Sequence, residues 1–282
     1  MNVVDLHTHT TFSDGTLTPA QLVEEAHRLG LKAVAVTDHD NPNGYAQAKE
    51  AGDRLGVEVI PGIEISTKIE RAIHILGYYI RSDSEAASSL LQWIVDDREA
   101  RNRKMCALMQ ADGIPVYYEQ MREEYGSVIG RPHFGEVLMK LGLADSINDA
   151  FDKYIEKGRK YYIPRNIIPM DRAIGLVLDA GGIPVLAHPY QYTNDETKLR
   201  EIIEYCLQFG LMGMECRYSL YSEEQSLKLE RLAEEYHLLK TGGSDFHGDR
   251  KPHIHLGRGT EETPLQVPYE WVEELKIRLE RT

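Results

Sequence analysis

VVDLHTHTTFSDGTLTPAQLVEEAHRLGLKAVAVTDHD, residues 3–40, predicts the fold more directly than any other stretch of the chain. An apolar strand is expected at residues 3–6 and a second one at residues 33–37. Between them, Thr18 suits an N-cap, the proline after it suits the first helical position, and Gly30 suits the stop near residue 29. Alternation of strand, helix and strand predicts an α/β protein with parallel strands.

The same alternation continues at both ends of the chain. Further strands are expected at residues 58–66, 72–79, 183–188, 212–216 and 239–242, which gives seven, one short of an eight-stranded barrel. Further helices are expected at about 44–55, 169–180, 195–209, 222–236 and 268–281. The middle of the chain breaks this rhythm with long helical patterns such as SSLLQWIVDDREARNRKMCALMQ and no convincing strand. We therefore expect a barrel domain of residues 1–81 and 166–282, and a helical insertion domain of residues 82–165.

Composition limits the classes of protein to consider. The 282 residues are 42% hydrophobic and 27% charged, which is typical of an ordered globular chain. No apolar run approaches the roughly 20 residues of a membrane helix, and the N-terminus lacks a signal-peptide pattern, so we expect no membrane association and a cytoplasmic location. A net charge of −13 argues against broad binding to duplex nucleic acid, although a small anionic substrate could bind through cations. Cys106, Cys206 and Cys216 are widely spaced in apolar contexts and are expected to fill the core.

Candidate metal ligands lie at or just after the carboxyl ends of the expected strands. In a parallel barrel these ends meet at one face, where active sites are built. In chain order the candidates are His7 and His9, Asp38 and His39, Glu64, His74 within the fourth strand, His188, Glu215 and Arg217, and Asp245 and His247. Positions far apart in the sequence thus form a single predicted constellation.

His7 and His9 form an H-x-H pair whose imidazoles point to the same side of the chain, so both can bind one metal ion. His253 and His255 repeat this spacing after a charged loop without an acidic partner, and we expect them to be structural.

Glu64 lies in an otherwise apolar strand, where an ionised carboxylate is costly unless it is paired or metal-bound. A strand-end salt bridge is the alternative to a carboxylate that bridges two metal ions. His74 alone could equally be a core histidine, but His188 and the SDFH segment favour a ligand role. The small residues Gly242, Gly243 and Ser244 before Asp245 let the backbone approach a crowded site.

The donor set combines imidazoles and carboxylates without cysteine. Such a set suits Zn²⁺, Mn²⁺ or Fe²⁺ better than Ca²⁺ or an iron–sulfur cluster. The chain has no GxxxxGK[ST] loop, no GxGxxG after the first strand and no GxSxG elbow, so those chemistries are not indicated.

Five motifs in order, DLHTHTTFSDGTLTP, VTDHD, PGIEIS, AHP and GGSDFHG, resemble the PHP (polymerase and histidinol phosphatase) family over about 1–80 and 165–260. The resemblance implies a distorted (β/α)7 barrel and two or three divalent ions. It also implies a ligand set for each ion: His7, His9, Glu64 and Asp245 for the first, Glu64 with His74 and His188 for the second, and Asp14, His39 and His247 for a third ion or for the phosphate. Many relatives have histidine where this chain has Asp14, which could weaken the third site.

The helical insertion and the segment GRPHF at residues 130–134 resemble a subgroup of the family that acts on nucleoside 3′,5′-bisphosphates or removes nucleotides from short RNA. The resemblance implies that Arg131 and His133 bind the substrate phosphate; the alternative is a surface pair at the start of a helix.

The function expected is hydrolysis of a nucleotide phosphate ester by a metal-bound hydroxide. The expected catalytic residues are His39, Asp245 and His247. Of these, His39 and His247 are expected to stabilise or protonate the leaving group. The rivals are a histidinol-phosphate-type phosphatase, an amidohydrolase, and a non-catalytic metal-stabilised module that binds a partner through the insertion.

Overall fold

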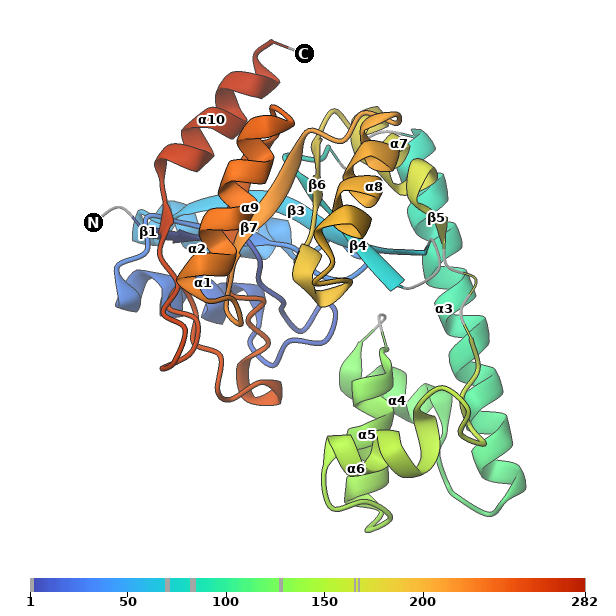
Figure 1. Cartoon of the computed structure of the whole chain (residues 1–282). Helices are drawn as coiled ribbons and strands as arrows, with labels where there is room; N and C mark the ends of the chain where they lie inside the picture. Colours follow the sequence, from blue (N-terminus) through green and yellow to red (C-terminus); the bar gives the residue numbers. More distant parts are fainter. Residues whose placement is uncertain are drawn as a thin grey trace.

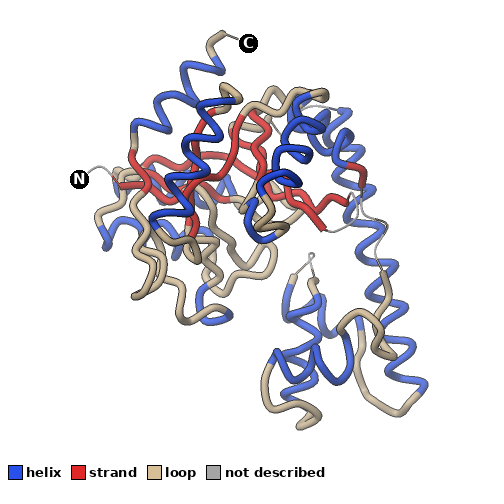
Figure 2. The backbone as a smooth tube through the Cα atoms, viewed as in Figure 1, coloured by secondary structure: helices blue, strands red, loops and turns tan. Residues whose placement is uncertain are grey.

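A sheet that curves into a nearly closed barrel forms the centre of the molecule, with helices on its outer side (Figures 1 and 2). The computed structural model describes residues 3–68, 72–81, 85–126, 129–164, 166 and 168–281. The strands are β1 (Val3–Asp5), β2 (Ala33–Val36), β3 (Glu58–Lys68), β4 (Ala72–Tyr78), β5 (Ile168–Pro169), β6 (Ile183–Leu186), β7 (Gly213–Tyr218), β8 (Leu239–Gly243) and β9 (Val267–Pro268). The helices packed around them are α1 (Pro19–Leu29), α2 (Tyr45–Leu55), α7 (Met170–Asp179), α8 (Glu196–Leu207), α9 (Glu223–Glu235) and α10 (Glu270–Leu279).

The strand order is β8-β7-β6-β4-β3-β2-β1-β9, with β5 paired to β3. The sheet nearly closes between β8 and β1, because the backbone N–H of Leu6 after β1 donates to the carbonyl of Gly242 in β8 at 3.1 Å. All seven expected strands are present, and the barrel-like α/β architecture is confirmed. The sequence did not reveal β5 and β9, because a strand of two residues is too short to show a period of two.

Among the seven expected strands, one runs against the expectation of a parallel barrel, which is wrong at this point. β4 pairs antiparallel with both β3 and β6. Only three residues separate β3 from β4, too few for the crossover that a parallel connection needs. The start of β4, rather than its end, therefore lies at the face where the neighbouring strands end. His74, the third residue of β4, pairs with Ser66 and reaches that face.

The expected helices of the barrel are all present, and α1 shows why its sequence forms one. The Thr18 hydroxyl accepts a hydrogen bond from the backbone N–H of Gln21, and the Gln21 side chain accepts one from the backbone N–H of Thr18. Gly30 ends the helix at φ 74°. Its buried face includes Leu22 and Val23, which pack in one cluster with side chains of β2. Burial of each such side chain contributes about 1.5–3 kcal/mol.

The regular elements between β4 and β5 are all helices in the described residues. It consists of α3 (Glu85–Ala111), α4 (Tyr118–Tyr125), α5 (Arg131–Lys140), α6 (Ile147–Ala150) and a π-helical turn, η1 (Phe151–Ile155). In Figure 1, α3 leads away from the barrel and α4 to α6 gather beside its far end. They enclose a core of their own that includes Met105, Met109 and Phe134. The domain boundaries expected at 82 and 165 fall on residues outside the described part, so this division stays a prediction.

Ile94 of α3 packs in the hydrophobic core of the barrel, and two ion pairs also join the described part of the helical segment to the barrel. Arg98 of α3 forms a buried ion pair with Asp40, directly after His39. Arg250 places Nε 2.5 Å from Glu136 of α5. The insertion is thus connected to two loops that carry candidate ligands.

All three cysteines are buried and free, as expected. Among the described helices, none combines the length and the apolar character that a membrane crossing requires.

Candidate metal centre

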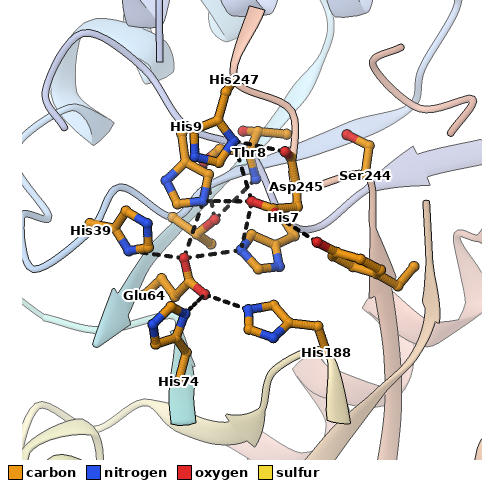
Figure 3. A network of polar contacts seen from close by, with 12 residues as sticks. His7, Thr8, His9, His39, Glu64, His74, His188, Ser244, Asp245 and His247 are labelled. Atoms are coloured by element: carbon orange, nitrogen blue, oxygen red, sulfur yellow. Dashed lines mark hydrogen bonds and ion pairs between the residues drawn. The ribbon is translucent and has the colours of Figure 1, made fainter. Parts of the chain in front are cut away.

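The predicted ligands converge at the mouth of the barrel, where Figure 3 shows their side chains pointing toward one another. His7 and His9 follow β1 and are both fully buried. Thr8 between them turns the other way, and its hydroxyl donates to the carbonyl of Ala35 at 2.6 Å. The extended backbone therefore directs both imidazoles of the H-x-H pair into the cluster.

Glu64 occupies the middle of the cluster, and its two carboxylate oxygens face different histidines (Figure 3). Oε2 lies 3.3 Å from His7 Nε2, 3.2 Å from His9 Nε2 and 3.0 Å from His39 Nδ1. Oε1 lies 2.6 Å from His74 Nδ1 and 2.9 Å from His188 Nε2. A carboxylate placed in this way can bridge two cations, one on each oxygen.

Three overlapping groups of donors could each hold a metal ion. They are His9, Asp14, His39 and His247; His7, His9, Glu64 and Asp245; and His39, Glu64 and His74. Within the second group, His9 Nε2 lies 3.2 Å from both Glu64 and Asp245, and His7 Nε2 lies 3.7 Å from Asp245. Ligands on one tetrahedral ion, with bonds of about 2.0–2.1 Å, lie about 3.3–3.4 Å apart. The donors are thus spaced as a coordination shell would be.

The grouping differs in two details from the sets implied by the family resemblance. His9 joins Asp14, His39 and His247 as a fourth donor. His39, rather than His188, completes the group of Glu64 and His74. His188 nevertheless adjoins this group through its contact with Glu64, so all nine predicted ligands lie in one cluster.

Unpartnered polar atoms test whether these residues fit divalent ions. Five buried atoms of the three donor groups have no hydrogen-bond partner: His7 Nε2, His9 Nε2, Asp14 Oδ1, His39 Nδ1 and Glu64 Oε2. Burial of an unpaired polar atom costs about 1–3 kcal/mol, so such atoms are normally satisfied. Ions among these donors would satisfy all five, and the residues therefore fit a metal centre.

The electrostatics of the cluster also favour cations. Burial would raise the pKa of Glu64, but His74 and His39 hold that pKa well below its usual range. Burial would lower the pKa of His9, yet the nearby carboxylates of Asp245 and Glu64 raise it to about 9. The carboxylates thus stay ionised and attract positive charge, which divalent ions can supply.

Asp245 is oriented by partners outside the predicted set. The Tyr218 hydroxyl donates to Asp245 Oδ2 at 2.7 Å, and Lys251 Nζ lies 2.7 Å from the same oxygen. Oδ1 is left to face the imidazoles of His7 and His9. The sequence revealed neither partner, since no spacing relates them to Asp245.

Strained backbone conformations and a close approach of two backbone segments both occur at the metal centre. Asp40, His188 and Asp245 have positive φ values of 56°, 26° and 56°. For residues other than glycine this conformation is costly and concentrates at functional sites. The close approach expected near Asp245 is confirmed, because a Cβ on Gly243 would lie 2.3 Å from the backbone nitrogen of His7.

Glu215 of β7, one of the candidates at the strand ends, lies in none of the three donor groups and instead orients two of the other candidates. Its fully buried carboxylate accepts from His7 Nδ1 at 3.0 Å and from the backbone N–H of His188 at 2.7 Å. The first bond places the hydrogen of His7 on Nδ1 and leaves Nε2 free to bind a metal ion, while the second holds the strained backbone of His188. An acidic residue in the apolar strand MECRY was the available signal, as it was for Glu64.

We expect Glu215→Gln to weaken metal binding about 10- to 100-fold, as for other partners of metal-bound histidines. An amide can accept only one of the two hydrogen bonds, because its NH₂ group would face a donor. Competition with a chelator measures the affinity. Glu230→Gln, which alters a carboxylate paired with Arg217 on the outer side of β7, is the matched control. Equal affinities in both variants would contradict the role of Glu215.

The two predicted phosphate-binding residues of α5 lie in different surroundings. His133 is buried, and its Nδ1 accepts from the backbone N–H of Gly130 at 2.8 Å. Burial and the charge of Arg250 lower its pKa to about 3, so the ring is neutral and carries its hydrogen on Nε2. A Cβ on Gly130 would lie 3.9 Å from Asp14 Oδ2, which brings the start of α5 beside the metal centre.

Arg131 is one-third exposed and lies over the rings of Phe151 and Tyr162, at 5.3 and 5.5 Å from their centroids. Its NH1 is 3.8 Å from Glu156. His253 and His255, expected to be structural, are both exposed and belong to none of the three donor groups.

Comparisons with known proteins find relatives that match almost the whole chain. The chain is 35% identical over 260 residues to the 5′-3′ exoribonuclease Rnm of Salmonella typhimurium, covering 91% of this chain and 88% of that protein. It is 30% identical over 281 residues to the 3′,5′-nucleoside bisphosphate phosphatase of Chromobacterium violaceum, covering 99% and 98%. A solved structure of a metal-dependent phosphoesterase from Bifidobacterium adolescentis superposes with a TM-score of 0.85 at 30% identity, covering 98% of this chain and 96% of that chain.

The model of the PHP domain matches residues 5–239, which include all the candidate ligands except Asp245 and His247. The match covers most of the chain, and the cluster at the barrel mouth agrees with it. This protein therefore belongs to the PHP domain family.

Proposed function

We propose that this protein is a metal-dependent phosphoesterase that hydrolyses nucleotide phosphate esters, with nucleoside 3′,5′-bisphosphates or the ends of short RNA as substrates. The observation that carries the proposal is the set of three donor groups at the barrel mouth. They overlap, because His9, His39 and Glu64 each belong to two of the groups. The names of the relatives support it, since one is an exoribonuclease and another a nucleoside bisphosphate phosphatase. The mixture of nitrogen and oxygen donors favours two or three ions of Mn²⁺, Zn²⁺ or Fe²⁺.

The ions would neutralise negative charge that develops on the phosphoryl group and lower the pKa of water. The chain supplies the positions: His7, His9, Glu64 and Asp245 would hold one ion, and Glu64 extends its other oxygen toward His74 and His188.

The accessible side of the centre indicates where the substrate enters. The side chains of His39 and His74 are 18% and 23% exposed, whereas His7 and His9 are fully buried. A phosphate ester would therefore approach from the His39 and His74 side. His39 and His247 are the residues proposed to stabilise the leaving oxygen, and neutral His133 could donate from Nε2 to a phosphate oxygen.

The test is a panel of phosphate esters assayed with metal-loaded protein. It should contain a nucleoside 3′,5′-bisphosphate, short RNA with a 5′-phosphate, histidinol phosphate and simple monoesters, together with a set of amides. We expect the nucleotide esters to be hydrolysed with the highest kcat/KM. Hydrolysis of amides alone would favour an amidohydrolase, and metal binding without any turnover would favour a binding module.

Arg131→Ala tests the phosphate contact proposed for α5. If Arg131 binds the phosphate that does not react, the contact is equally strong in ground state and transition state, so its loss appears in KM. We expect the KM for a nucleoside 3′,5′-bisphosphate to rise about 10- to 100-fold, the range for hydrogen bonds to a charged group. The KM for a nucleoside monophosphate should change much less.

Two further variants define the cause of this effect. Arg131→Lys should restore little, because lysine cannot form the paired hydrogen bonds of a guanidinium. Arg159→Ala removes an exposed arginine from the same helical segment and should leave KM unchanged. Equal losses on both substrates would place Arg131 at the reacting phosphate. No loss on either substrate would show that Arg131 is a surface residue without a role in substrate binding.

A further inference from the structure

A cavity of about 710 Å³ opens beside the metal centre, between α8, the loop after β6 and the start of β4. The residues around it include Ile73, Tyr190, Tyr192, Asn194, Lys198 and Tyr205, and we call it the tyrosine pocket. Its volume falls within the range of about 300–1,000 Å³ that is usual for small-molecule sites. None of the metal-centre residues lines it, so it adds a separate feature to the site.

The tyrosine pocket is connected to the metal centre through Tyr192. The backbone N–H of His74 donates to the Tyr192 hydroxyl at 2.7 Å. The ring of Tyr192 also lies 5.3 Å from that of His188. His74 and His188 are the two histidines on Glu64 Oε1, so the pocket adjoins that end of the centre.

The helical insertion adjoins the opposite end. There the start of α5 approaches Asp14, and Asp14 lies 3.3 Å from His247 Nε2. The centre is therefore flanked by phosphate-binding candidates on one side and by the tyrosine pocket on the other. A nucleotide whose reacting phosphate lies at the centre would have its sugar and base free to extend into that pocket.

The chemistry of the lining favours a base over a second phosphate. Lys198 and Glu201 contribute one charge of each sign, so the pocket has no excess of positive charge to attract an anion. Three tyrosine rings offer flat surfaces on which a base can stack, and stacking tolerates any base. The amides of Gln191 and Asn194 provide donors and acceptors for the polar edge of the ring.

We propose that the tyrosine pocket binds the nucleobase of the substrate, which makes it a nucleoside subsite of the phosphoesterase centre. This assignment rests on the proposed function for its link to catalysis. It explains why a pocket with three tyrosines and no net charge lies against two of the candidate ligands.

Adenosine tests the tyrosine pocket without using catalysis, because it has a base and a sugar but no phosphate to reach the ions. Its binding to metal-loaded protein is measured by calorimetric titration. Tyr205 is 38% exposed, so its replacement should leave the fold intact. We expect Tyr205→Ala to weaken adenosine binding about tenfold, in line with the loss of one stacking ring. Tyr205→Phe keeps the ring and should bind as the unaltered protein does.

Tyr117→Ala is the matched control, since Tyr117 is an exposed tyrosine of the insertion, 47% accessible and outside the pocket. The kinetic counterpart compares adenosine 3′,5′-bisphosphate with ribose 3,5-bisphosphate, which lacks the base. Tyr205→Ala should reduce kcat/KM about tenfold for the first and leave the second unchanged.

The possible outcomes separate the two proposals. If adenosine does not bind, or binds equally to Tyr205→Ala and Tyr117→Ala, the nucleoside subsite is wrong even if phosphate esters are hydrolysed. If adenosine binding depends on the ring of Tyr205 but no phosphate ester is hydrolysed, the subsite stands as a nucleoside site and the proposed function is wrong.

Discussion

Removal of divalent ions with a chelator, followed by dialysis, is expected to abolish hydrolysis of every phosphate ester that this protein accepts. Five buried atoms of the three donor groups have no hydrogen-bond partner, and the carboxylates beside them stay ionised. Without cations, a negatively charged ester would therefore approach uncompensated negative charge. Mn²⁺, Zn²⁺ or Fe²⁺ should restore activity, and elemental analysis at each step gives the number of ions bound.

Controls must separate a metal-dependent reaction from a metal-dependent fold. Circular dichroism should show unchanged helix content after chelation, because the barrel and the insertion have hydrophobic cores away from the centre. The Tm should nevertheless fall, since a bound ion stabilises the folded state by mass action. Ca²⁺ should restore little activity, because it prefers oxygen ligands and the centre is rich in imidazole. Full activity in protein shown to be free of metal would overturn the proposed function.

The sequence predicted the barrel well because its strands and helices are short, regular and clearly separated. Thr18, Gly30 and the apolar runs of β2 and β6 are local signals, and local signals can be read without the rest of the chain. The direction of β4 was not local information. A period of two describes which face a side chain takes and is the same for either direction of the strand. The only clue was the missing helix between β3 and β4.

The candidate site likewise has a part that the sequence predicts and a part that it does not. His7, His9, Glu64 and Asp245 are carboxylates and imidazoles near strand ends, and a barrel brings strand ends together, so their convergence could be predicted. The contacts that orient these ligands could not be predicted, because the contact of Glu215 with His7 spans 208 positions and depends on which strands are neighbours. The tyrosine pocket likewise combines the start of the reversed strand β4 with α8. A prediction that took β4 as parallel would have placed Ile73 at the other end of the barrel.

The substitution with the largest expected effect on turnover is Glu64→Gln. Both oxygens of this carboxylate are used, one facing His7, His9 and His39 and the other facing His74 and His188. An amide keeps the size of the side chain but loses the charge and offers only one oxygen to a cation. We expect kcat to fall by at least about 100-fold and metal content to decrease, while the fold is retained.

His253→Ala is the control that the chain itself provides, because His253 belongs to a second H-x-H pair with the same spacing as His7 and His9. Its side chain is exposed and lies outside the donor groups, so kcat and metal content should stay within about twofold of the unaltered protein, as is usual for a surface substitution. Elemental analysis, kcat and circular dichroism should be measured on both variants. Loss of secondary structure in Glu64→Gln alone would mean that the carboxylate is needed for folding, and Glu64→Asp, which keeps the charge, would then separate the two roles. Equal damage from both substitutions would show that the metal centre had been assigned to the wrong pair of histidines.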